Sequence, residues 1–149
     1  MTIINNQLSH LETNGLVKLT QTTPELEYLF RHALVQDAAY ASLLNADRRQ
    51  LHQTIGETLE TLYPDRLDGL SALLGHHFAL AGDDRRAYGY FIQAGDTAVS
   101  SGANKEAIAH YSNALELARK IDADSEEWIT VYGRLGRALE LDSQFKQAI

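Results

Sequence analysis

The adjacent histidines His76 and His77 are the residues of this sequence that most suggest metal or acid–base chemistry. Imidazole is a common zinc ligand, but a zinc pair on one helix has i,i+4 spacing and needs a third ligand. Adjacent residues point to different sides of a helix, so we expect no metal site at this pair. His52 and His110 stand singly in helical patterns, and we expect each imidazole to be solvated or partly packed.

Other signatures of catalysis are missing from the sequence. The phosphate-binding pattern Gly-x-x-x-x-Gly-Lys-Ser/Thr does not occur. The candidate nucleophiles lie outside the sharp, glycine-flanked turns that expose a catalytic serine; they are Ser42, Ser71, Ser100, Ser101 and Ser112. Carboxylates gather where they would cap helices, as in Asp83-Asp84. We therefore expect no catalytic residues, no cofactor and no enzymatic activity of the chain itself.

Composition narrows the class of protein. The chain has 149 residues, of which 44% are hydrophobic, enough to bury a core. Its formal charge is −7, and no basic run is longer than Arg48-Arg49 or Arg85-Arg86, so nucleic acid is a disfavoured partner. Cysteine is absent, which excludes disulfides and thiolate metal sites. We found neither a secretory leader pattern nor a run of about 18 apolar residues, and we expect a cytoplasmic protein without membrane contact.

The first 45 residues predict a helix followed by a β-hairpin. Apolar residues recur at helical spacing across residues 4–13, and Asn14-Gly15 supplies a left-handed stop. Two short apolar runs at residues 16–19 and 26–30 flank a polar turn, a pattern typical of antiparallel strands. The order helix, strand, strand is how a winged-helix domain ends. We therefore assign residues 1–45 to a partial winged-helix segment.

From residue 33 onward the sequence predicts helices only. Apolar residues recur at three- and four-residue spacing in residues 33–44, 46–63, 67–81, 84–100, 104–121 and 125–141. In the second of these helices, one apolar seam is predicted from Leu51, Ile55, Leu59 and Leu62. Asp124 and Glu127 have the spacing of a capping box at the start of the last helix.

Residues 46–149 carry an internal repeat. Leu74-Gly75-His76-His77-Phe78 matches the Leu-Gly-x-x-aromatic part of a TPR first helix, and Ala87 follows Gly75 by twelve residues. The same glycine-to-alanine step joins Gly95 to Ala107 and Gly136 to Ala148. Small residues let two helices approach, and nearby aromatic rings fill the gap between hairpins. The predicted fold class is mainly α: an α-α superhelix of TPR-like hairpins, preceded by the partial winged-helix segment with one short β-hairpin.

The repeat departs from a tandem TPR in its spacing. Ala87 and Ala107 are 20 residues apart, where a TPR repeat has about 34, so helix 84–100 would serve two hairpins. The third unit would stop at Ala148, just as its second helix begins. We therefore expect the repeat region to be truncated at its C-terminus and the chain to be a fragment of a larger protein.

The most distinctive segments of the sequence are residues 27–44 (EYLFRHALVQDAAYASLL) and 48–52 (RRQLH). They resemble the region after the ATPase module of bacterial STAND-type (AAA-like) NTPases, including ATPase-containing adenylate and guanylate cyclases and related transcriptional activators. The similarity spans residues 8–118. The resemblance implies a parent protein with an NTPase core, a winged helix, a TPR-like sensor array and an output domain.

The resemblance also indicates one site residue. In related apoptotic and plant-resistance NTPases, a winged-helix histidine contacts the phosphate of bound ADP, and His32 is the candidate for this contact in a complete parent. Arg31 and Ala33 depart from the family pattern, which has a hydrophobic residue and an acid at these places.

Three functions follow from these observations. The first is a regulatory interaction module that binds a protein or peptide partner, other domains of the parent chain or a small inducer, without turnover. The alternative is a DNA-binding winged-helix regulator, with residues 4–13 as recognition helix and residues 20–25 as wing. The third is a hydrolase that uses His76 and His77. Self-association through exposed apolar helix faces is a further expectation.

Overall fold

The computed structural model describes residues 2–23 and 26–147, and the side-chain surroundings of residues 4–23 and 26–143. The chain divides into two compact units, Met1–Asn45 and Ala46–Ile149. The described helices include none that is both long and apolar enough to cross a membrane.

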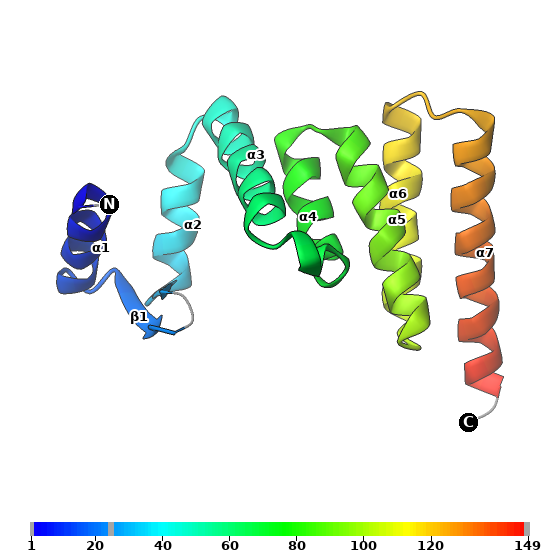
Figure 1. The fold of residues 1–149 in the computed structure, drawn as a ribbon, viewed down its shortest axis with the longest axis horizontal. Coiled ribbons are helices and arrows are strands. Elements are labelled where there is room, and N and C mark those ends of the chain that lie inside the picture. The colour runs from blue at the N-terminus through cyan, green and yellow to red at the C-terminus, as the bar shows by residue number, and fades with distance from the viewer. Residues whose placement is uncertain (1, 24–25, 148–149) are drawn as a thin grey trace. The chain divides into compact units, whose positions relative to one another are not determined.

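The first unit contains a helix, a two-stranded antiparallel sheet and a second helix. These elements are α1 (Thr2–Thr13), β1 (Val17–Gln21), β2 (Glu27–Phe30) and α2 (Ala33–Ser42) (Figure 1). Gly15 ends α1 with a φ of +72°, and Val17 lies opposite Phe30 in the hairpin. The predicted hairpin is confirmed, although Pro24 and Glu25 of its turn lie outside the described residues. Val17 is buried whereas Phe30 and Leu34 are exposed, so this unit has a small core.

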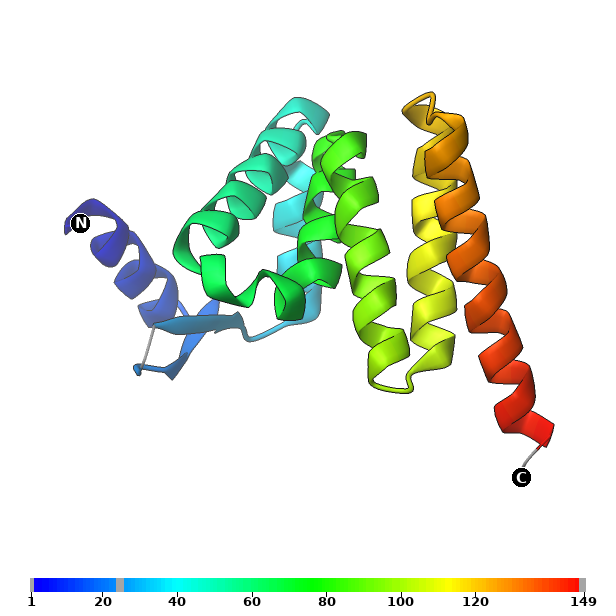
Figure 2. The same cartoon turned by 45° about the vertical axis from the view of Figure 1, so that its right-hand side comes forward.

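The regular elements of the second unit are all helices within its described residues. Its elements are α3 (Asn45–Leu62), the 3-10 turn η1 (Pro64–Arg66), α4 (Leu67–Ala81), α5 (Asp84–Ser100), α6 (Asn104–Lys120) and α7 (Ser125–Gln147). Figures 1 and 2 show α4 to α7 side by side in chain order, each antiparallel to the next. The predicted fold class, a mainly α chain with a helical superhelix of hairpins after one short β-hairpin, is confirmed.

The helix ends follow the local chemistry of the sequence. Gly82 and Gly102 end α4 and the turn after α5 with φ angles of +85° and +77°. At the start of α7, the Glu127 amide donates to Asp124 Oδ1 at 2.9 Å, and the Asp124 amide donates to Glu127 Oε2 at 3.0 Å. The predicted capping box is therefore confirmed. Helix α7 runs six residues beyond its predicted end, because no proline or glycine interrupts residues 142–147.

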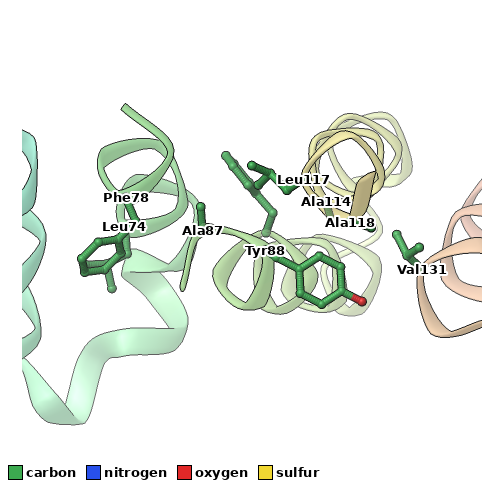
Figure 3. Close-up of a cluster of buried hydrophobic side chains, with 9 residues drawn as sticks. Leu74, Phe78, Ala87, Tyr88, Ala114, Leu117, Ala118 and Val131 are labelled. Carbon is green, nitrogen blue, oxygen red and sulfur yellow. The ribbon is translucent and has the colours of Figure 1, made fainter. Parts of the chain in front are cut away.

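The core of the second unit is shared by four successive helices. Figure 3 shows this cluster, which comprises Leu74, Phe78, Ala87, Tyr88, Phe91, Ala114, Leu117, Ala118 and Val131. A second cluster joins α5, α6 and α7 through Ala98, Ala107, Tyr111 and Ala138. Alanines occupy many of these positions because small side chains let neighbouring helices approach closely.

At three successive helix–helix interfaces, an aromatic ring of one helix packs against a glycine of the helix that precedes it. A Cβ atom at Gly56 would lie 2.8 Å from the Phe78 ring, and one at Gly75 would lie 3.1 Å from the Phe91 ring. A Cβ at Gly95 would overlap the Tyr111 ring. We call this arrangement the glycine–ring contact. It joins α3 to α4, α4 to α5 and α5 to α6.

The predicted seam of α3 is confirmed only in part, because Ile55 and Leu59 are partly buried and Leu59 packs against the main cluster. Leu51 and Leu62 are exposed, with 43% and 61% of their surface accessible. The buried residues of α3 are His52 and Gly56. The Phe78 ring packs against the backbone at Gly56, so the inward face of α3 is centred on this glycine. A periodicity of apolar side chains does not reveal such a face, because glycine has no side chain.

The glycine–ring contact predicts opposite effects for two glycines of α5. Gly95→Ala should lower the free energy of unfolding of the helical unit by about 1–3 kcal/mol, because the new methyl group overlaps the Tyr111 ring. Gly89→Ala should raise it by about 0.5–1 kcal/mol through helix propensity, since a Cβ there meets no described atom within 4 Å. Urea unfolding followed by circular dichroism measures both, and equal effects would contradict the account.

Candidate functional site

His32 lies at the start of α2, where its backbone carbonyl accepts the amide of Val35 at 3.0 Å and that of Gln36 at 3.3 Å. Its imidazole makes no capping hydrogen bond to the helix, and the residue is exposed. The imidazole is therefore positioned by the strand-to-helix turn and stays open to solvent.

A hollow of about 450 Å³ surrounds this histidine within the first unit. It is lined by Lys18, Thr20, Leu29, Phe30, Arg31 and His32. Two permanent positive charges beside an imidazole attract anions, but each of these side chains is exposed, so water and salt screen the field. The hollow can hold an anion weakly, and it lacks the buried backbone amides of a dedicated phosphate site.

The structure pairs two histidines that lie 25 residues apart in sequence. The Nδ1 atoms of His52 on α3 and His77 on α4 are 2.9 Å apart, so one imidazole donates a hydrogen bond to the other. His76 is exposed, and its ring lies edge-on to the His77 ring with the two centroids 6.0 Å apart. Within the described residues, no group of three or more His, Cys, Asp or Glu side chains is placed to share a metal ion.

Both imidazoles of this pair resist protonation. Burial, and then the nearby His76, lowers the pKa of His52. Burial, and then His52 and His76, lowers the pKa of His77. Sequence spacing gave no signal for this contact, because it depends on the glycine–ring contact that brings α3 against α4. The expectation that His52 would be solvated or only partly packed is wrong, since 8% of its surface is accessible.

The histidine pair predicts acid sensitivity of the helical unit. Because the folded-state pKa values lie below the unfolded value of about 6.5, the unfolded chain binds more protons, and stability falls as the pH falls below about 6.5. Urea unfolding between pH 7.5 and about 5.5 should show this loss. His77→Gln should flatten the pH dependence, whereas His32→Gln, at an exposed imidazole, should leave it unchanged. An unchanged slope in His77→Gln would exclude the pair as its cause.

Arg86 and Tyr90 of α5 make polar contacts with α3. Arg86 Nε donates to Asp83 Oδ2 at 2.6 Å, and its terminal nitrogens lie 3.3 Å from carboxylate oxygens of Glu57 and Glu60. The guanidinium carbon also lies 4.1 Å from the centroid of the Phe78 ring. Tyr90 Oη donates to Glu60 at 2.6 Å, and burial together with this hydrogen bond raises the pKa of Tyr90 to about 12. These contacts join α5 to α3.

A second polar tie links α5, α6 and α7. Tyr111 Oη donates to Asp96 Oδ1 at 2.7 Å, and Arg134 Nε donates to the same oxygen at 2.8 Å. Burial, followed by the Asp96 hydrogen bond, raises the pKa of Tyr111. The Asp96 carboxylate thus accepts hydrogen bonds from the hydroxyl of Tyr111, whose ring lies on Gly95, and from the guanidinium of Arg134 on α7.

The candidate nucleophiles are bonded locally. Each serine hydroxyl donates to a backbone carbonyl three or four residues earlier, at 2.7–2.9 Å; the serines are Ser42, Ser71, Ser100, Ser101 and Ser112. None of these five bonds involves an imidazole or a carboxylate. The hydroxyls therefore have the geometry of helix back-bonding and lack an activating base.

A shallow groove of about 260 Å³ lies between α5 and the first turns of α7. Its lining residues are Tyr88, Gly89, Ile92, Asp124, Glu126, Glu127 and Thr130. Tyr88 Oη donates to the Glu127 carbonyl at 3.2 Å and fixes the width of the groove at one end. Arg85 pairs with Glu127 at the rim. We call this feature the α5–α7 groove; it combines an apolar floor with a rim on which carboxylates outnumber cations.

Comparison with protein-family models, with curated proteins and with solved structures finds no match to this chain.

Proposed function

We propose that the chain is a non-catalytic interaction module, in which the helical unit binds a protein or peptide segment. The observation that carries the proposal is the α5–α7 groove, whose lining comes from two helices held at a fixed separation. Fixed, concave surfaces between helical hairpins are where helical repeat proteins bind extended segments.

The chemistry of the groove favours a segment with a basic side chain. Tyr88 and Ile92 offer an apolar floor on which the methylene stem of Lys or Arg can pack. Asp124 and Glu127 are engaged in the capping box, and Glu127 also pairs with Arg85, so Glu126 is the lining carboxylate that would meet the charged end. The net charge of −7 attracts a basic partner from a distance.

The resemblance of residues 27–44 and 48–52 to STAND-type NTPases supports a regulatory setting. We propose that the helical unit serves as a sensor array of such a signalling NTPase, with the first unit as the joint to the nucleotide-binding core. In that setting the partner is a protein, a peptide or another domain of the same parent. His32 and its hollow would complete a nucleotide site only with groups from that core.

A selection from a random peptide display library, with the full chain as bait, tests the proposal. We expect Lys- or Arg-containing peptides to be enriched. Glu126→Lys in the groove should weaken their binding about tenfold, a change that corresponds to about 1.4 kcal/mol. The matched control Glu116→Lys reverses an exposed carboxylate of α6 outside the groove, and it should have little effect.

Two results would count against this function. One is the absence of any enriched peptide, and the other is binding that Glu126→Lys and Glu116→Lys weaken equally. The second result would mean that the net charge attracts basic peptides without a defined groove.

A further inference from the structure

Gly89 is an exposed glycine in the interior of α5, and it lines the α5–α7 groove. A Cβ atom there would meet none of the described atoms within 4 Å, so the space above it belongs to the open groove. A glycine inside a helix is unfavourable relative to alanine. Gly69 and Gly136 also face open space, but neither lines this groove. At Gly89 the missing side chain lets a ligand approach the backbone closely.

The other wall of the groove comes from α7 and carries two polar side chains that the helical unit does not use. Glu126 and Thr130 both line the groove, and their spacing of four residues places them on one side of α7. Within the described residues, neither the Glu126 carboxylate nor the Thr130 hydroxyl has a hydrogen-bond or ion-pair partner. A carboxylate and a hydroxyl therefore stand ready to accept hydrogen bonds from a ligand.

The neighbouring charges are already paired. Glu127 pairs with Arg85 and also takes part in the capping box. Further along the same two helices, Arg134 Nε lies 2.8 Å from Asp96 Oδ1. These two bridges join α5 to α7, and they leave Glu126 as the carboxylate of the groove that can meet an incoming cation.

The groove has the size for one side chain. Its volume of about 260 Å³ lies below the roughly 300–1,000 Å³ of pockets that enclose small-molecule ligands. We therefore expect it to accept a single side chain of a longer segment.

We propose that the α5–α7 groove is an arginine site, in which one arginine of the partner segment lies over Gly89 and its guanidinium binds Glu126 and Thr130. This inference rests on the proposed function, and it names the side chain that the groove selects and the glycine that makes room for it.

The lining favours arginine over lysine. The guanidinium is flat, so it can lie against the bare backbone at Gly89, and its fork of N–H donors can pair with the Glu126 carboxylate and still reach the Thr130 hydroxyl. The ammonium of lysine is a compact and strongly hydrated point charge. A guanidinium is more weakly hydrated, so it loses less water on entering a groove floored by Tyr88 and Ile92.

Exposure limits the affinity of this site. Gly89 and Glu126 are both exposed, so water and salt screen the attraction between the carboxylate and the guanidinium. One arginine in a short peptide should therefore bind with a millimolar dissociation constant, and a tighter partner needs contacts beyond the groove.

Two short peptides test the site, acetyl-Ala-Ala-Arg-Ala-Ala-amide and its lysine counterpart, in an NMR titration of the full chain labelled with nitrogen-15. The arginine peptide should shift the amide signals of Gly89, Glu126 and Thr130, with a dissociation constant about threefold or more below that of the lysine peptide. Gly89→Ala should weaken the arginine peptide about fivefold while raising the melting temperature, because the methyl group fills the space of the guanidinium and improves helix propensity. Thr130→Val should reduce the preference for arginine.

Gly69→Ala is the matched control, because it adds a methyl group at an exposed, open glycine of α4 that does not line the groove. It should leave the binding of both peptides unchanged. Equal affinity for the two peptides, or binding that Gly89→Ala does not weaken, would overturn the arginine site and leave the proposed function standing, since that function requires only a basic segment. Groove amides that neither peptide shifts at millimolar concentrations would also overturn the site, and the peptide selection would then decide the proposed function separately.

Discussion

The contact between an aromatic ring and a bare glycine of the preceding helix sets the geometry of the helical unit. It brings Phe78 onto Gly56, Phe91 onto Gly75 and Tyr111 onto Gly95, so the same kind of contact recurs at three interfaces. The buried alanines around these rings are small because the glycines have already brought the helices together. These contacts position α3 to α6, and the burial of Val131 and Ala138 positions α7; the α5–α7 groove depends on both.

The ionisable side chains of the helical unit mostly act between helices. Arg86 joins α5 to α3, Asp96 joins α5 to α6 and α7, and the pair of His52 and His77 joins α3 to α4. The same arrangement raises the pKa of Tyr90 and Tyr111 and lowers those of the two imidazoles. These shifts favour the neutral form of each of the four side chains near neutral pH.

Helix boundaries were predictable from the sequence, whereas helix faces were predictable only in part. Gly82, Gly102 and the Asp124–Glu127 capping box mark ends through local backbone chemistry, so no tertiary information was needed. The inward face of α3 and the contact of His52 with His77 depend on the approach of Phe78 to Gly56, which only the folded chain shows. The α5–α7 groove was likewise unpredictable, because its lining combines residues of two helices about 35 positions apart.

The most direct test of the interaction-module account is the thermal unfolding of the full chain, followed by circular dichroism with and without ADP, ATP and a short DNA duplex at two salt concentrations. The account predicts a helical transition whose midpoint none of these ligands moves, because the hollow at His32 is lined by exposed, solvent-screened charges and the chain has a net charge of −7. A shift by a nucleotide would contradict it and make the hollow at His32 a binding site in its own right. A salt-sensitive shift by DNA would contradict it in favour of a DNA-binding regulator.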